Sequence, residues 1–426
     1  MTPLVPAIIL FAVAYILMMI FDNHRPWIAM GAAVAFIVTG LLPLGDVAAS
    51  VDLNVLLMMA GTMGLVSLFF ESRMPALLAD LVMERVSSVQ MAVVALALFA
   101  GVISAFMDNV ATVLMVAPVA MEICKKLDTN PIPFIIAIAV SSNLQGAATL
   151  VGDTTAIMLG SAQGMSFTDF FWYHGKPGMF FIVELGALLS AMILFVLFRG
   201  AKGRIPKVTQ RTEVTDFVPT ILLVGSIVLL IVASFIPVKP DVTNGLICCG
   251  MLLIGIIHNF IRNRSLDAIV KPLRSIDLMT IGLLLGLFLM IGGIKAQGVI
   301  DAAANLLARV GGGNVFLLYT IIVWASVLIS AFIDNIPYVA TMIPVIASMS
   351  ATLGIDPTVL YFGLLSGATL GGNCTPIGAS ANITGISILE NVGYDVKNKD
   401  FLRIGIPFTL AAIIPAYVLI WLLFGV

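Results

Sequence analysis

The chain has 426 residues, of which 60% are hydrophobic and 10% are charged, and its net charge at pH 7 is −2. Together with a mean hydropathy of +1.12, these values exclude an ordinary soluble domain, in which about 25% of residues are charged. Long apolar stretches recur from end to end, so we expect an all-α polytopic membrane protein rather than a β-barrel, and no basic tract indicates a nucleic-acid partner.

Apolar runs of about 20 residues mark the candidate membrane spans. In chain order we expect spans at 4–21, 27–44, 54–70, 132–150, 178–198, 217–237, 244–261, 278–293, 357–373 and 404–425. Two longer apolar segments, 89–123 and 314–352, are each interrupted by Asp-Asn. We expect each to form a re-entrant hairpin, because irregular backbone at membrane depth survives only where protein or a wet cavity surrounds it.

The distribution of Lys and Arg predicts an orientation. If both hairpins are re-entrant, 17 of the 21 Lys and Arg fall on one side of the membrane, Arg25 among them. Cytoplasmic loops carry such an excess of positive charge. We therefore expect the 199–216 loop to be cytoplasmic and both termini to lie outside, in a protein of the inner (plasma) membrane.

Two motifs recur 226 positions apart. "SAFMDNVATVLMVAP" at 104–118 returns as "SAFIDNIPYVATMIP" at 330–344, and "GAATLVGD" at 146–153 aligns with "GNCTPIGA" at 372–379. The chain thus reads as two repeats, 1–200 and 217–426, joined by a linker at 201–216. Each repeat has five predicted crossings, one hairpin and one broken helix. Because five is odd, the second repeat is expected to have inverted topology, as in many secondary transporters.

Four carboxylates fall inside predicted membrane segments: Asp108, Asp153, Glu184 and Asp334. A charge at the bilayer centre costs at least about 2.5–3.5 kcal/mol, which makes each of them a candidate functional group. No Lys or Arg lies in the central segments, so we expect a mobile cation or a proton as the partner of Asp108 and Asp334. Both aspartates are also expected to cap the second helix of their hairpin, while Glu184 is expected to face a neighbouring helix.

The predicted cation and substrate site combines the hairpin tips with the two Gly-rich breaks, because carboxylate, amide, hydroxyl and carbonyl oxygens suit a hard cation. The candidate residues are Asp108, Asn109, Thr112, Asn143, Thr149, Gly152, Asp153, Asp334, Asn335, Thr341, Asn373, Thr375, Gly378, Ser380 and Asn382. Na⁺ is expected at Asp108, Asn109, Asp334 and Asn335. Asp153 departs from the repeat, since Ala379 occupies the matching position; it is a candidate proton carrier, supporting residue or helix cap. Close helix packing through small residues is the competing role for the Gly/Thr breaks.

No other chemistry is indicated. The four cysteines form no CxxC pair or Cys/His cluster, and no Walker A sequence is present. No arrangement of an enzyme active site is visible either, so we expect a non-enzyme with no cofactor other than Na⁺ or H⁺ as coupling ion.

The four motifs resemble those of the ion transporter superfamily, and most closely the branch of arsenite permeases, NhaD-type antiporters and P-proteins. The resemblance covers nearly the whole chain. It implies an elevator-type transporter and a homodimer in the lipid bilayer. It also implies one cation site at Asp108, Asn109 and Thr112 with the 143–153 loop, and a second at Asp334 and Asn335 with the 372–382 loop. P-like relatives continue the first break as Gly-Asp-Pro-Pro-Asn, whereas this chain has Ala156 in place of the asparagine, so the first site is expected to bind differently.

The sequence therefore favours a secondary active transporter driven by Na⁺ or H⁺. Two tip aspartates repel a dianion, which favours Na⁺/H⁺ antiport or proton-coupled efflux of a small metalloid hydroxide such as arsenous or silicic acid. The alternative is Na⁺-coupled uptake of an inorganic or organic anion of the dicarboxylate or citrate type. A channel would differ from all of these by its faster flux and by the absence of counter-transport.

Overall fold

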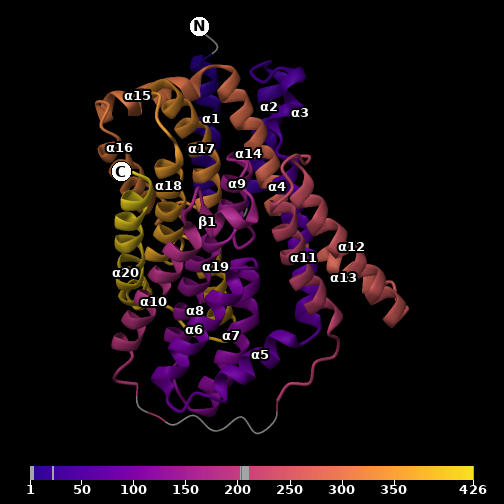
Figure 1. Cartoon of the computed structure of the whole chain (residues 1–426). Coiled ribbons are helices and arrows are strands. Elements are labelled where there is room, and N and C mark those ends of the chain that lie inside the picture. Colours follow the sequence, from indigo (N-terminus) through magenta and orange to yellow (C-terminus); the bar gives the residue numbers. More distant parts are fainter. Residues whose placement is uncertain (1–3, 22–23, 202, 204–210, 426) are drawn as a thin grey trace.

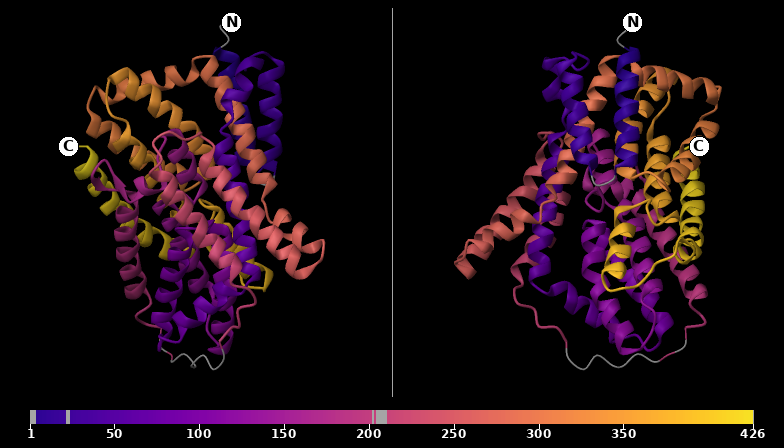
Figure 2. Two further views of the ribbon diagram at one scale, coloured as in Figure 1. Left: turned by 45° about the vertical axis from the view of Figure 1, so that its right-hand side comes forward. Right: turned by 180° about the vertical axis from the view of Figure 1, so that it is seen from behind.

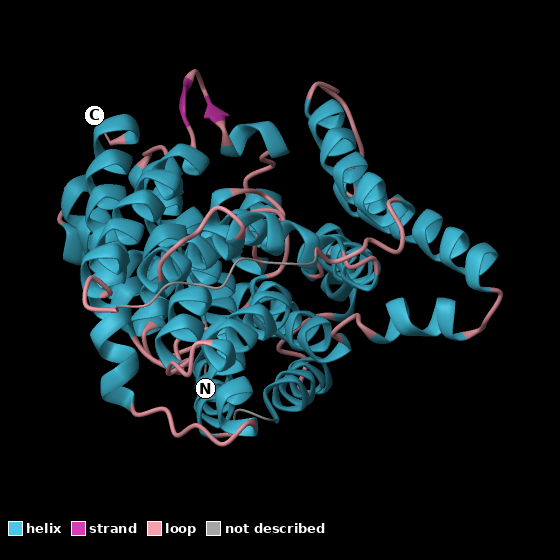
Figure 3. Cartoon of the chain, turned by 90° about the horizontal axis from the view of Figure 1, so that it is seen from below, coloured by secondary structure: helices cyan, strands magenta, loops and turns pink. Residues whose placement is uncertain are grey.

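The computed structural model describes residues 4–21, 24–201, 203 and 211–425, and these are almost entirely helical (Figure 3). The elements of the first part are α1 (Leu4–Ile20), α2 (Arg25–Val38), η2 (Leu44–Asp46), α3 (Val47–Ser50), α4 (Leu53–Glu71), α5 (Met74–Met83), α6 (Val89–Ser104), α7 (Asn109–Lys126), α8 (Ile132–Gln145), η3 (Gly146–Ala148), α9 (Thr154–Ala162), η4 (Phe167–Phe170), β1 (Trp172–Tyr173), β2 (Lys176–Pro177) and α10 (Met179–Leu197).

The described residues of the second part repeat this order of α-helices, with η5 matching η3 and with no counterpart of η2, η4 or the strands. Its elements are α11 (Val218–Ser234), α12 (Thr243–Asn263), α13 (Asp267–Arg274), α14 (Leu278–Ala296), α15 (Val299–Gly311), α16 (Val315–Ser330), α17 (Asn335–Leu353), α18 (Thr358–Gly371), η5 (Gly372–Cys374), α19 (Ser380–Asn391) and α20 (Asn398–Phe424). Both ends of α6 and α16, of α8 and α18, and of η3 and η5 are 226 positions apart. The sequence repeat is therefore also a repeat of local structure.

Equivalent caps explain why the helices begin where they do. Asp52 accepts a hydrogen bond from Val55 N at the start of α4, and Asp277 accepts one from Thr280 N at the start of α14. Ser88 and Asn314 likewise cap α6 and α16. Each such cap contributes about 1 kcal/mol to helix stability.

Helices of the two parts pack against each other in pairs, α2 on α14, α4 on α12 and α10 on α20. Equivalent glycines permit the first two contacts. A Cβ on Gly61 would lie 2.5 Å from the backbone of Cys248, and one on Gly286 would lie 2.6 Å from that of Ala29. Small residues at such crossings let helix backbones approach closely. The two parts therefore share one interior rather than forming separate bodies (Figure 1).

The two predicted hairpins are helix–turn–helix pairs at opposite ends of the molecule. The α6–α7 pair lies with α5 at the lower end of the molecule in Figure 1, where α10 also ends, and α16–α17 lies with α15 at the upper end. Between them, α9 packs on α17 and α19 packs on α7. Each broken helix thus contacts the hairpin of the other part of the chain.

The outer surface suits a lipid environment. Among the described residues, six helices are long and apolar enough to cross a membrane, or up to seven if one bent pair is a single span. Large apolar side chains on the surface, such as Leu188, Met192 and Leu253, are more than half exposed. In Figure 2, α12 and α13 project from the body of the molecule.

Two expected spans are wrong at their ends. The span at 27–44 ends as a helix at Val38, because Thr39 closes the last turn and Gly40 has a φ of +74°, which L side chains rarely adopt. The span at 132–150 ends at Gln145, continues as one 3₁₀ turn, and becomes extended at Thr149. This break separates α8 from α9, as expected for a broken helix.

Candidate functional site

The two hairpin tips have the same geometry. Asp108 has φ −52° and ψ 137°, and Asp334 has φ −51° and ψ 133°. Asp108 Oδ2 accepts a hydrogen bond from Ala111 N at 2.9 Å, and Asp334 Oδ1 accepts one from Ile336 N at 3.0 Å. The expected capping role is therefore confirmed for both, and in each case one carboxylate oxygen is left for another partner.

Thr149 and Gly152, with their equivalents Thr375 and Gly378, lock the helix breaks against the hairpin tips. The Thr149 hydroxyl donates to the Ala105 carbonyl, and Thr375 donates to Ala331. A Cβ on Gly152 would lie 2.6 Å from the Gly146 carbonyl oxygen, and one on Gly378 would lie 2.5 Å from that of Gly372. These four residues hold the site together and are absent from the lining of the main cavity described below.

A chain of buried asparagines joins the two parts of the molecule. Asn109 Nδ2 donates to Asn143 Oδ1 at 3.0 Å, and Asn143 Nδ2 donates to Asn373 Oδ1 at 3.0 Å and to the Thr369 carbonyl at 2.7 Å. Asn373 Nδ2 in turn donates to the Val140 carbonyl at 2.9 Å. The structure thus brings together three of the predicted site residues, with their amides engaged by one another.

Asp153 connects the first helix break to the second hairpin. Its Oδ1 accepts from Thr154 N at 2.7 Å and its Oδ2 from the Thr155 hydroxyl at 2.9 Å, so it caps α9. Asn335 Nδ2 lies 3.5 Å from Asp153 Oδ2, at the limit of a hydrogen bond. Because Asp153 is only 5% exposed, its charge depends on these polar partners or on a bound cation.

The hairpin tips and the first break face a cavity of about 640 Å³, the main cavity. Its central polar lining consists of Asp108, Asn109, Asp153, Thr154, Asn335 and Ser380. The lining also includes Arg73, Asp277 and Thr280, from the start of α5 and of α14, with apolar residues such as Met63 and Phe70. Of these elements, α5 lies at the lower end of the molecule in Figure 1.

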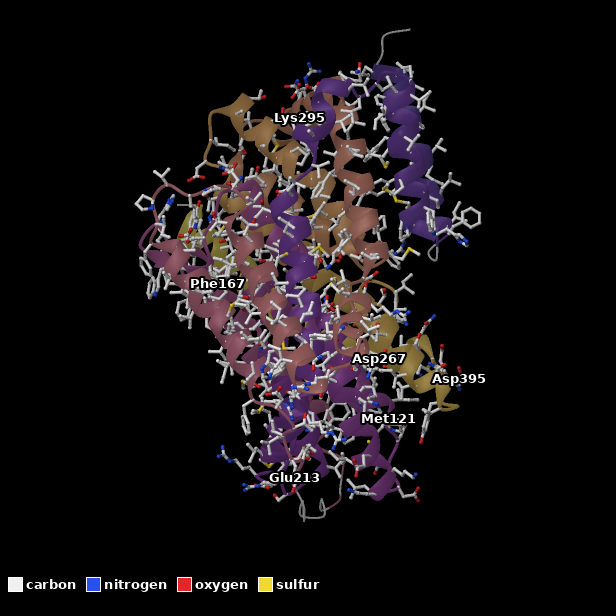
Figure 4. The ribbon with its side chains drawn as sticks, turned by 90° about the vertical axis from the view of Figure 1, so that its right-hand side faces the viewer. Met121, Phe167, Glu213, Asp267, Lys295 and Asp395 are labelled. Atoms are coloured by element: carbon white, nitrogen blue, oxygen red, sulfur yellow. The ribbon has the colours of Figure 1, made fainter. Side chains whose placement is uncertain are left out.

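A second cavity of about 720 Å³ lies on the other side of the central residues. Asp46, Asp52 and Lys295 line it, together with Met158 of α9 and Pro344 of α17. Lys295, which lines this second cavity, lies at the opposite end of the molecule from Glu213 in Figure 4.

The helices α4, α9, α14 and α17 contribute residues to both cavities. The buried side chains of Met59 and Leu284 lie in α4 and α14 between the stretches that line the two cavities.

Asp334 has a fixed positive partner, contrary to expectation. Arg25 Nη1 lies 3.2 Å from Asp334 Oδ2, and the two side chains are 18% and 11% exposed. The expectation was wrong because Arg25 was assigned to a cytoplasmic loop from its position between two spans. In the folded chain it begins α2 and reaches the second hairpin tip, a contact across 309 positions that no local pattern predicts.

The remaining predicted residues serve the backbone. The hydroxyls of Thr112 and Thr341 donate to carbonyls four positions earlier, those of Asp108 and Pro337. Asn382 Nδ2 donates to the Gly372 and Thr375 carbonyls at 3.0 Å each. Asn382 thus holds the second break closed, whereas the equivalent Ala156 has no such group.

Several participants were missed by the sequence analysis. Ser142 donates to the Asn109 carbonyl at 2.9 Å, and the Thr155 and Thr369 hydroxyls lie 3.0 Å apart. Thr369 stands 226 positions after Asn143, so the repeat itself could have identified it. Glu184 contacts Gln145 of α8 at 3.4 Å, which agrees with its expected position against a partner helix, and it is absent from the main cavity lining.

Within the described residues, no group of three or more His, Cys, Asp or Glu side chains could hold a metal ion. Any cation in the main cavity would therefore depend on one or two carboxylates with amide, hydroxyl and carbonyl oxygens. Such oxygen sets suit weakly held hard cations rather than zinc or other transition metals.

Buried carboxylates and broken helices around a central cavity, within an apolar helical body, define an integral membrane transporter. The chain belongs to the citrate transporter (CitMHS) family, whose model matches residues 15–364 and 263–426. The family lies within the ion transporter superfamily, so the resemblance found in the motifs is confirmed.

Three proteins of known sequence illustrate what this chain is similar to, and the first of them is named a transporter. The uncharacterized transporter Rv2684 of Mycobacterium tuberculosis is 30% identical over 98% of both chains. The 46 kDa membrane protein of Mycobacterium leprae is 35% identical over 75% of this chain and 74% of its own. The human P protein is 26% identical over 75% of this chain and 47% of its own.

The crystal structure of the YdaH transporter of Alcanivorax borkumensis has a similar fold. It aligns with a TM-score of 0.60 over 100% of this chain and 99% of its own, at 16% identity. At this level of identity the likeness concerns the fold alone.

Proposed function

We propose that this chain is a secondary active transporter that couples to Na⁺ or H⁺ in the main cavity, at Asp108 and Asp153. The observation that carries the proposal is the convergence of Asp108, Asn109, Asp153 and Asn335 on that one cavity. Ionisable residues within membrane segments typically mark ion pathways. The amides of Asn109 and Asn335 add uncharged oxygen donors beside the two carboxylates.

The two carboxylates give a physical basis for exchange. Two negative charges facing the same partly buried cavity repel each other, and this repulsion is stronger there than in water. Either a Na⁺ ion or a proton relieves it, so the two ions compete for the same site. Competition at a site that faces each side of the membrane in turn produces antiport.

We further propose that the two repeats have inverted topology and that access alternates between the main cavity and the second cavity. The opposite placement of the α6–α7 and α16–α17 hairpins supports this proposal (Figure 1). The short barrier between the two cavities also supports it. Along α4, this barrier lies between Val55, which lines the second cavity, and Met63, which lines the main cavity. A small displacement of α9 and α17 against α4 and α14 could therefore exchange the open side.

The proposed transported species is Na⁺ against H⁺, or a small metalloid hydroxide exported with protons, since an uncharged solute does not meet repulsion from Asp108 and Asp153. A second candidate is Na⁺-coupled uptake of an organic anion. The family description names citrate, and Arg73 lines the cavity together with residues at the N-termini of α7 and α9. Helix N-termini and arginine favour anionic groups.

Purified protein in liposomes loaded with a pH-sensitive dye tests the proposal. A Na⁺ gradient, with K⁺ as control, should drive proton movement in the wild type and in Asp267→Asn, which removes an exposed carboxylate (Figure 4). Asp108→Asn should abolish it while preserving the cap, because Asn is an equally good N-cap. Flux that needs added citrate would favour the second candidate. No flux with Na⁺, citrate, arsenite or silicate would refute the proposal.

A further inference from the structure

The two hairpin tips are alike in backbone but differ in electrostatic surroundings. Asp108 lines the main cavity of about 640 Å³, whereas Asp334 is absent from that lining although the next two residues, Asn335 and Ile336, belong to it. Asp334 forms its ion pair with Arg25 instead. Among the described residues, no ion pair joins Asp108 to a basic side chain.

The guanidinium of Arg25 is held in place from two directions. Its Nη1 approaches Asp334 at 3.2 Å, and its Nε donates to the Met18 carbonyl at 3.2 Å. Met18 lies in the last turn of α1, where unpaired carbonyls and the helix dipole favour a positive charge. Arg25 is thus oriented toward the tip by the end of one helix and by the carboxylate it neutralises.

Little space remains beside this pair. The cavity lined by Tyr15, Arg25, Ile333, Asp334 and Pro337 has a volume of about 10 Å³. That volume is near the minimum for a single water molecule. A free cation could bind Asp334 here only by displacing the guanidinium.

The equivalent basic residue of the second repeat does not make such a pair. Lys239 follows α11 as Arg25 follows α1, and its Nζ donates to the Ala233 carbonyl at 2.8 Å. It lines a different cavity, with Asp241 and Asn244, and not the one that contains Asp108. One repeat therefore supplies a cation to a hairpin tip and the other does not.

We propose that Arg25 is a tethered cation that occupies the second tip in place of a free ion, so that each chain binds one free coupling cation, at Asp108. The inference rests on the proposed function for the identity of the ion at Asp108. Whichever ion binds at Asp108, Arg25 closes Asp334 to free cations. Arg25 is therefore a residue that sets the coupling stoichiometry.

Equilibrium binding of radioactive Na⁺ to the purified full-length chain tests the inference, with K⁺ keeping ionic strength constant. The wild type should bind one Na⁺, and Asp334→Asn should also bind one, because the site at Asp108 is kept and the carboxylate that is removed holds Arg25 rather than a free ion. Arg25→Gln should bind two, and Arg25→Gln with Asp334→Asn should return to one. Arg25→Lys should behave as wild type, and Arg309→Gln controls for loss of an exposed positive charge.

Two outcomes would overturn the inference. One is a folded Arg25→Gln protein that gains no Na⁺ site. The other is a wild type that binds two Na⁺ together with an Asp334→Asn variant that binds only one. This comparison tests the inference even if Arg25→Gln does not fold. A wild type that binds no Na⁺, combined with a new site in Arg25→Gln, would refute Na⁺ as the coupling ion while supporting the role of Arg25.

Discussion

Asp153 in the first helix break lies 3.5 Å from the amide nitrogen of Asn335 at the second hairpin tip, a contact across 182 positions. The repeat offers no symmetric counterpart, because Ala379 stands where Asp153 would recur. The pair therefore breaks the symmetry of the site and places a single additional negative charge between the two tips.

Replacing Asp153 with asparagine should weaken Na⁺-dependent proton flux while leaving the fold intact. Asn retains the capping geometry of α9 but loses the charge. Contacts with charged groups contribute about 1.5–3 kcal/mol, so the apparent Na⁺ affinity should fall by roughly 10- to 100-fold. The measurement is the Na⁺ concentration at half-maximal flux in proteoliposomes.

Asp395→Asn provides the matched control, because Asp395, labelled in Figure 4, is exposed and lines neither cavity. An Asp153→Asn protein with the Na⁺ dependence of the wild type would exclude a direct role for this carboxylate and leave it as a helix cap only.

Gly152→Ala and Gly378→Ala should each destabilise the protein and stop transport. In both variants the new methyl group would meet a backbone carbonyl oxygen at 2.5–2.6 Å, a contact that only backbone movement can relieve. Such overpacking typically costs about 1–3 kcal/mol, which should lower the thermal unfolding temperature by several degrees.

Gly282→Ala is the control for the glycine variants. Gly282 lies in α14, and the position that the new methyl group would take has no heavy atom within 4 Å. Alanine favours a helix by up to about 1 kcal/mol over glycine, so this variant should be as stable as wild type or more so. Equal stability of all three variants would show that the breaks are not packed as described.

Much of this arrangement is predictable from the sequence, for a physical reason. The Asp-Asn dipeptides, the Gly/Thr breaks and the helix bounds depend on neighbouring residues, since capping and glycine geometry act within one or two turns. A duplicated chain shows these local signals twice. Asp108, Asp153 and Asn335 could therefore be assigned to one region before their contacts were known.

What the sequence did not predict depends on distant packing. The Arg25–Asp334 pair joins residues 309 positions apart, and the Asn143–Asn373 bond joins residues 230 positions apart. No periodicity links such pairs. From the sequence we expected the asparagines to be ligands of a bound ion. In the structure, Asn143 and Asn373 instead form hydrogen bonds with each other and with backbone carbonyls.

Asn143→Ala should be among the most destabilising single changes in the site. It removes partners from Asn109 and Asn373 at once, and both residues are at most 5% exposed. Each buried polar group left without a partner costs about 1–3 kcal/mol. Thermal unfolding of the purified protein measures the effect, with Asn305→Ala on the exposed face of α15 as the control. Equal unfolding temperatures for the two variants would contradict the proposed role of the asparagine chain.

Cysteine labelling from each side of the membrane tests whether access alternates. None of the four native cysteines lines either cavity, which makes their removal acceptable as a background. Ser67→Cys in the main cavity should react with a charged thiol reagent added on the side of the 201–216 linker, and Ser50→Cys in the second cavity should react from the other side. Movement of α9 and α17 against α4 and α14 should close one cavity as it opens the other. Conditions that produce this movement should therefore lower the labelling rate at Ser67→Cys as they raise the rate at Ser50→Cys. Rates that rise and fall together would indicate a continuous pore, and labelling of both positions from the same side would rule out access that alternates between the two cavities.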